Sequence, residues 1–322
     1  MRAKSRWLWT TLCGAFCFAA LACAALPSQG AAQTPTPPGT PTWQGARALE
    51  DITRIVALGA RAPGAPGHDR AIAMIQDEFQ RVGVPVSAQT WTVRTPNGSR
   101  TYTNLVARLN PEARRRVIAG THYDSIIRAY ADPRSPNGYM PGANNSASGV
   151  AVLLETARAI QASERKPNVG VDFIFFDGEE GPLALGAGDP NWHAVGSPYF
   201  AAHVSDYYPD GLPQSAAIFD MVCYRNLRLP QELGSLLKAP EQTRAFWSIG
   251  SRIAPAVFNV PDRPISIFDD QDALNAVGIP SFLVIGFNYD PWFNTTHDTP
   301  DKCSAAALQA VGDTLMGYIY TQ

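Results

Sequence analysis

A histidine and an aspartate lie two residues apart at the end of an apolar stretch, as His122 and Asp124. In an extended segment, side chains at i and i+2 share a face, so the Asp124 carboxylate is placed to orient the His122 imidazole. A carboxylate in this position commonly supports a metal-bound histidine. The alternative is a hydrogen-bonded polar pair at a strand end, because such short patterns are common.

Adjacent carboxylates follow the most hydrophobic stretch of the chain, where FIFF leads into Asp177, Gly178, Glu179 and Glu180. Neighbouring negative charges repel, and a bound cation would offset them, leaving one carboxylate as a ligand and the other as a proton carrier. The alternative is a solvated acidic loop. Asp220 closes a third apolar stretch, where an aspartate is also a common cap or turn residue.

The elements that must position these side chains are indicated by hydrophobic periodicity. Helical spacing predicts helices over 43–59, 67–84, 147–161, 243–255, 270–278 and 304–320. Alternating or continuous apolar runs predict strands over 86–95, 101–109, 115–125, 168–180, 215–224 and 279–287. Strands that alternate with helices are typical of a layered α/β sheet.

The polar clusters recur where the predicted strands end. In open α/β sheets, ligand sites form beyond the carboxyl ends of the strands. This rule directs attention to His122, Asp124, Glu179, Glu180 and Asp220. We expect them in one α/β domain over residues 44–322, although the length also allows two domains.

The N-terminal region has the composition of a secretory signal. Residues 1–33 combine a basic start, an apolar run and a small-residue exit, and residues 34–43 form a Pro-rich linker. We therefore expect a secreted or periplasmic protein with no membrane segment after cleavage. An uncleaved membrane anchor and a lipoprotein cleaved before Cys23 are the alternatives.

Composition narrows the classes of partner. The chain is 45% hydrophobic and 17% charged, and without residues 1–33 it holds 23 basic and 28 acidic residues. Nucleic-acid binding calls for a basic face, so we expect no nucleic-acid partner. Two cysteines, Cys223 and Cys303, remain after signal removal, and either a disulfide or two buried thiols fits them.

Six motifs in order give the chain a family resemblance. They are GTHYDS, GANNSASGVAVLLE, FIFFDGEE, IFD, IFDDQDALNAVGIP and FNTTHDTPDKCS. Over residues 45–320 the chain resembles the secreted zinc aminopeptidase and glutaminyl cyclase family. The resemblance implies a three-layer α/β/α sandwich with a mixed, mostly parallel central sheet. The long insert between Glu180 and Gly196 is closer to the glutaminyl-peptide cyclotransferase branch.

The resemblance also implies roles for individual residues. Glu179 resembles the general acid/base and Glu180 a zinc ligand. His122 and Asp220 resemble the ligands of the other metal position in two-zinc peptidases. In single-zinc cyclases, Asp220 would instead belong to a proton-handling network. Further members of the implied site are Asp269 in that network, Asp270 and Asp124 as supporting residues, and Trp292 and Phe293 in the substrate pocket.

The implied activity is the conversion of the N-terminal glutamine of a peptide to pyroglutamate with release of ammonia. A metal-dependent aminopeptidase of the same fold is the first alternative. Peptide N-termini are the implied partners, zinc is the implied cofactor, and we expect a monomer.

Two amides stand where the family has zinc ligands. Asn145 replaces an aspartate, and alignment on Thr295 and Asp298 places Asn294 at a histidine position. His297 lies three residues later, up to ~10 Å away and on the opposite face of an extended loop. Zinc prefers thiolate, imidazole and carboxylate, whereas the oxygen-rich remnant better suits calcium or magnesium. The second alternative is therefore a non-catalytic or metal-deficient peptide-binding relative.

Overall fold

The computed structural model describes residues 42–322 except 97, 184, 187–188 and 263. The predicted signal peptide, 1–33, and all but the last two residues of the predicted linker lie outside the described residues. Among the described residues, no helix has the length and apolar character needed to span a membrane.

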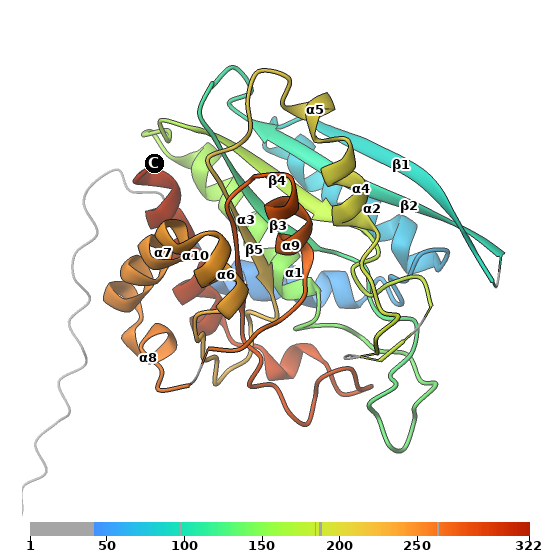
Figure 1. Cartoon of the computed structure of the whole chain (residues 1–322). Coiled ribbons are helices and arrows are strands. Elements are labelled where there is room, and N and C mark those ends of the chain that lie inside the picture. Colours follow the sequence, from blue (N-terminus) through green and yellow to red (C-terminus); the bar gives the residue numbers. More distant parts are fainter. Residues whose placement is uncertain (1–41, 97, 184, 187–188, 263) are drawn as a thin grey trace, which may run out of the picture. The chain divides into compact units, whose positions relative to one another are not determined.

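A six-stranded sheet runs through the described part of the chain in the order β1-β2-β4-β3-β5-β6. Its strands are β1 (Val86–Thr95), β2 (Gly98–Leu109), β3 (Arg116–His122), β4 (Gly170–Phe176), β5 (Ser215–Asp220) and β6 (Ser281–Ile285). Strands β4, β3, β5 and β6 are parallel, whereas β1 and β2 form an antiparallel hairpin that joins β4 at one edge. This hairpin extends away from the rest of the sheet (Figure 1).

Helices fill most of the connections between strands. They are α1 (Gly45–Val56), α2 (Pro66–Arg81), α3 (Ala147–Ala162), α4 (Gly196–Ala202), α5 (Val204–Tyr207), α6 (Leu233–Lys238), α7 (Pro240–Ile253), α8 (Pro255–Phe258), α9 (Asp270–Ala276) and α10 (Ala305–Tyr320), with a short 3-10 turn at Pro300–Lys302. The predicted helices and strands therefore all form, with shifts of a few residues at their ends.

The two faces of the sheet are covered by different helices. Helices α1, α2, α3, α7 and α10 share one hydrophobic cluster with the sheet, and α4 and α9 share the other. The result is a layered α/β/α arrangement, which confirms the expected fold class.

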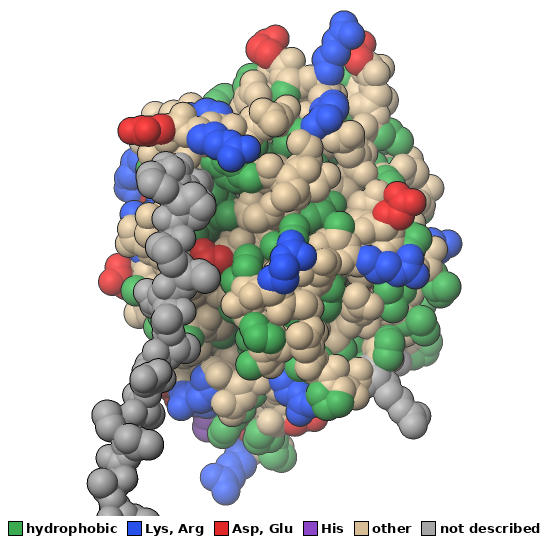
Figure 2. Space-filling model, turned by 90° about the vertical axis from the view of Figure 1, so that its left-hand side faces the viewer, with side chains coloured by type: hydrophobic (Ala, Val, Ile, Leu, Met, Phe, Trp, Pro, Cys, Tyr) green, Lys and Arg blue, Asp and Glu red, His purple; other side chains and the backbone are tan. Residues whose placement is uncertain are grey.

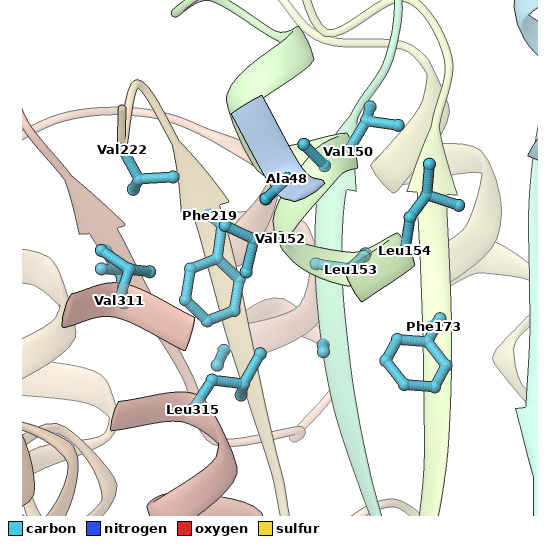
Figure 3. Close-up of a cluster of buried hydrophobic side chains, with 14 of the residues drawn as sticks. Ala48, Val150, Val152, Leu153, Leu154, Phe173, Phe219, Val222, Val311 and Leu315 are labelled. Atoms are coloured by element: carbon cyan, nitrogen blue, oxygen red, sulfur yellow. The ribbon is translucent and has the colours of Figure 1, made fainter. Parts of the chain in front are cut away.

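The larger cluster includes branched and aromatic side chains of α3, β5 and α10. Phe219, Val152 and Leu315 belong to it (Figure 3). Helix α3 lies so close to the sheet that a Cβ at Gly149 would come within 2.0 Å of Thr121 Oγ1 and 2.6 Å of the Phe219 carbonyl oxygen. Glycine at this position lets the helix that begins beside Asn145 pack directly on β3 and β5.

Cys223 and Cys303 form a disulfide, which settles the alternative that the sequence left open. The bond joins the segment after β5 to the segment before α10, and a β-bridge between Tyr224 and Cys303 lies beside it. It therefore ties the Asp220 strand to the loop that carries Asn294.

An ion-pair network joins α1, α2 and α3. Arg158 contacts Asp51 at 2.5 Å and Glu78 at 2.7 Å, and Arg54 contacts Glu78 at 2.8 Å. Burial alone would raise the pKa of Glu78, but the hydrogen bonds and charges of Arg158 and Arg54 lower it to about 2. Elsewhere on the surface, both signs of charge are spread among hydrophobic patches on the face shown in Figure 2.

We predict that Glu78→Gln lowers the free energy of unfolding by about 1.5–3 kcal/mol at neutral pH, because a charged hydrogen-bond acceptor is lost. The folded-state pKa of Glu78 lies below its ordinary 4.5, so this stabilisation is present above that pH and is lost as pH falls toward 2. Urea unfolding from pH 7 to pH 3 measures it, with the exposed Glu112→Gln as control. If the difference in unfolding free energy between wild type and Glu78→Gln stayed constant over this range, the ionised Glu78 would not be the source of the stabilisation.

Candidate active site

A cleft of about 1030 Å³ opens at the carboxyl ends of the parallel strands. Its floor is polar and includes Asn145, Glu179, Glu180, Asp220, Asp269 and Asn294. Its walls are largely apolar and include Met221, Trp192, Ile267, Phe268, Phe287 and Phe293. Phe268 stands at the rim with 78% of its surface exposed. Such a cleft suits a ligand with a polar end and an apolar body.

His122 ends β3 and is buried between two carboxylates. Its Nδ1 lies 3.2 Å from Asp124 Oδ1, and its Nε2 lies 3.2 Å from Asp220 Oδ1. Burial alone would lower the pKa of His122, but hydrogen bonds to both aspartates and the charge of Glu179 raise it well above its ordinary value. The structure thus brings together the pair expected from the HxD spacing and adds the strand-end aspartate of β5.

Asp124 also holds the turn that follows β4. Its carboxylate accepts hydrogen bonds from the backbone N–H groups of Glu179, at 3.2 Å, and Glu180, at 3.3 Å. The turn passes through Gly178 at φ 72°, where a Cβ would lie 2.5 Å from both Tyr102 and Val195. Only glycine fits this left-handed and crowded position, which aims both glutamates into the cleft.

The acidic residues of the floor are buried together. Burial raises the pKa of Glu179 well above its ordinary value, and it raises the pKa of Glu180 to about 8. Burial, with repulsion from Asp220 and Asp270, likewise raises the pKa of Asp269. Burial raises the pKa of Asp270 to about 7 against the opposing effects of His122 and the Ser197 hydroxyl. Burial therefore favours the protonated form of these four carboxyl groups.

Asn145 and Asn294 face each other across the floor. Asn145 Nδ2 donates to Glu180 Oε1 at 2.9 Å and to Asn294 Oδ1 at 3.2 Å. Asn294 Nδ2 donates to the Tyr130 hydroxyl at 2.9 Å. Asn294 is 2% exposed and has φ 51°, a backbone conformation that Asn and His adopt more readily than most residues. Asn294, the position selected by alignment on Thr295 and Asp298, thus lies in the floor of the cleft.

His297 lies on the outer side of the same loop. It is exposed, and its ring meets the edge of Trp292 with centroids 6.2 Å apart. Trp292, expected in the substrate pocket, is not among the described residues that line the cleft. Its ring packs under Lys302, whose Nζ is 4.7 Å from the ring centroid. The turn from Tyr289 to Trp292 directs Phe293, rather than Trp292, into the cleft.

Several supporting residues were missed in the sequence. His68 is a buried residue of α2 whose Nε2 lies 2.8 Å from Asp177 Oδ2. Asp298 accepts hydrogen bonds from the backbone N–H groups of Asn144, at 2.8 Å, and Asn145, at 3.1 Å. Asp177 lies two residues before Glu179, and nothing in the sequence pointed to His68 as its partner.

The donor set does not fit zinc. Around Glu180, the side chain of Asn145 presents N–H groups, and the amide of Asn294 stands where the family resemblance implies an imidazole. Asn145 Oδ1 is buried without a hydrogen-bond partner among the described residues, and one neutral oxygen is a weak zinc ligand. Within residues 42–322, as far as the structure describes them, no group of three His, Cys, Asp or Glu side chains is arranged to hold a metal ion.

We predict that Asp124→Asn lowers the free energy of unfolding by about 1.5–3 kcal/mol, because an ionised acceptor shared by three donors becomes a neutral amide. Urea unfolding at pH 7 measures the change, and Asp210→Asn, on an exposed loop, is the matched control. Equal stabilities for the two variants would mean that Asp124 does not hold the turn.

Comparison with known proteins places this geometry in a family. The sequence profile of peptidase family M28 matches residues 104–319. The chain is 35% identical over 130 residues to glutaminyl-peptide cyclotransferase of Bos taurus, a match that covers 37% of this chain and 35% of the bovine protein. This match thus spans about a third of that relative's length.

Solved structures extend the similarity to nearly the whole fold. Glutaminyl cyclase of Fimbriiglobus ruber superposes with a TM-score of 0.79 at 30% identity, covering 87% of this chain and 96% of that one. A Zn-dependent exopeptidase from Parabacteroides distasonis superposes with a TM-score of 0.80 at 25% identity, covering 88% and 100%. By its sequence profile and its fold, the chain belongs to peptidase family M28.

Proposed function

We propose that this protein is a glutaminyl cyclase-like member of its family that receives the N-terminus of a peptide in the cleft. There it converts an N-terminal glutamine to pyroglutamate and releases ammonia. The observation that carries the proposal is the set of buried carboxylates, Glu179, Asp220 and Asp269, at the base of an apolar-walled cleft. The overall similarity to glutaminyl cyclases supports it.

The chemistry proposed for the floor is proton transfer. The α-amino nitrogen attacks the side-chain amide carbon, the ring C–N bond forms, and the bond to the amide nitrogen breaks. Glu179 takes the proton from the attacking nitrogen and returns it to the departing nitrogen, which leaves as ammonia. Burial raises the pKa of Glu179, which suits a carboxyl group that must both accept and donate a proton.

His122 and the aspartates support Glu179 in this proposal. Asp220 holds His122 by a hydrogen bond of 3.2 Å, and His122 Nδ1 lies 3.9 Å from Glu179 Oε2. The imidazole thus offsets part of the repulsion between the buried carboxylates around it. Asp269 caps α9, where its side chain accepts from the N–H of Asp270.

No step of this mechanism is assigned to a metal ion. A relative of the same fold is named as a Zn-dependent exopeptidase, but the donor set of this chain does not fit zinc. Calcium and magnesium prefer oxygen ligands, and calcium takes about six to eight of them. Glu180, Asn294 and Asp220 would supply a minority of such a shell.

Export from the cytoplasm is a further part of the proposal. The composition of residues 1–33 supports a cleaved signal, and the tether 34–43 would then precede one catalytic domain over 44–322. The Cys223–Cys303 disulfide is consistent with an oxidising compartment.

A second candidate function is peptide binding without catalysis. The hydrogen bonds from Asn145 to Glu180 and Asn294 favour it, because they engage the N–H groups of Asn145 that could otherwise donate to a substrate carbonyl. In this case the cleft and its apolar walls would retain a peptide N-terminus but leave it unchanged.

We predict that the protein releases ammonia from a glutamine-initiated peptide and that Glu179→Gln lowers kcat by about 10²–10⁴-fold, because the proton carrier is lost. A coupled ammonia assay measures the rate, with mass spectrometry of the peptide product. The matched control is the exposed Glu164→Gln, which should keep the wild-type rate.

Other outcomes separate the alternatives. Free amino acids released from an unblocked peptide would favour an aminopeptidase. A peptide that binds in calorimetry but remains unchanged would favour the second candidate. Ammonia release that survives in Glu179→Gln would contradict the assigned proton carrier.

A further inference from the structure

A chain of side-chain hydrogen bonds crosses the cleft floor from Glu180 through Asn145 and Asn294 to Tyr130. The three links measure 2.9, 3.2 and 2.9 Å. We call these four residues the amide bridge. Asn145 and Asn294 are 5% and 2% exposed, so water competes little for these bonds.

The orientation of each amide follows from its neighbours. The NH₂ group of Asn145 faces Oε1 of Glu180, which accepts its hydrogen bond. The second N–H of Asn145 then requires the oxygen of Asn294, which turns the NH₂ group of Asn294 toward the Tyr130 hydroxyl. A flipped Asn145 would set its oxygen against the Glu180 carboxylate.

The amide bridge links segments that are remote in sequence. Asn145 precedes α3, Glu180 follows β4, and Asn294 lies in the loop after β6. Asp298 fixes the backbone of Asn145 from the side of that same loop, at 3.1 Å from the Asn145 N–H. A cation held by side chains from these loops would make the same cross-link, and it would also offset the charge of Glu180.

We infer that the amide bridge occupies the structural place of a metal ion and makes the cleft independent of divalent cations. The N–H groups of Asn145 point at the oxygens that a cation would have to bind. The inference concerns metal dependence and goes beyond the proposed cyclisation, because it stands whether or not the protein cyclises an N-terminal glutamine.

Substitution of both Asn145 and Asn294 should replace the amide bridge with a donor set that binds zinc. Asn145→Asp with Asn294→His directs a carboxylate and an imidazole toward Glu180, and zinc takes this donor set while retaining an open position. The backbone of residue 294 already has a conformation that histidine adopts. Asn145→Asp alone places two carboxylates against each other without a donor between them.

The first test uses the wild-type protein purified without chelators. Elemental analysis should find substoichiometric zinc, and neither EDTA nor added ZnCl₂ should shift the Tm. Stoichiometric zinc, or a Tm that falls in EDTA, would overturn the inference. These readouts do not depend on catalysis, so they remain decisive if no ammonia is released.

The second test compares three variants by calorimetric titration with ZnCl₂ and by thermal unfolding. The double variant Asn145→Asp/Asn294→His should bind zinc on the order of 100-fold more tightly than wild type and gain Tm on zinc addition. The Tm of Asn145→Asp alone should be lower with EDTA than without it, because its two facing carboxylates would then need a cation between them. The control Asn226→Asp/Asn259→His adds the same side chains at exposed positions outside the cleft and should behave as wild type.

Equal zinc affinities for wild type and the double variant would contradict the inference. Addition of Glu180→Gln to the double variant should abolish the gain, because it removes the remaining carboxylate of the set. If the double variant does not fold, the zinc content and EDTA response of the wild type still decide the question.

Discussion

The site depends on one buried carboxylate, that of Asp124. It accepts from the backbone N–H groups of Glu179 and Glu180 and lies 3.2 Å from the imidazole of His122, while its backbone carbonyl accepts from Ser146 Oγ at 2.6 Å. The end of β3, the turn after β4 and the start of α3 therefore meet at a single residue. A buried ion without such partners would be costly, so the same contacts that satisfy Asp124 also assemble the floor of the cleft.

The remaining charges follow from that assembly. Parallel strands deliver Glu179, Asp220 and the loops around Asp269 to one edge of the sheet, where burial and repulsion between carboxylates raise the pKa of Glu179 and of Asp269. His122 offsets part of this repulsion and is itself held in the charged form by two aspartates. The floor is in this way suited to storing and moving protons, which is the property that the proposed reaction needs.

The chain shows how a family fold can be kept while the chemistry of its site changes. The sheet and its helices superpose on those of glutaminyl cyclases, with a TM-score of 0.79 for one of them. Two amides nevertheless stand in the floor, where they hydrogen-bond to each other and to Glu180 and Tyr130. Because function resides in such contacts rather than in the fold, the similarity alone does not determine what the cleft does.

Hydrophobic periodicity in the sequence determined the helices and strands, because burial on a sheet or helix face imposes a local repeat that each segment carries by itself. The positions of the predicted strand ends in the sequence likewise indicated that His122 and Glu179 lie near one another. Only the tertiary structure decided the disulfide, the burial of His68, the side of the loop that Trp292 faces, and the direction of the Asn145 amide. Each of these depends on partners far away in sequence, whose approach is set by loop packing and leaves no local pattern.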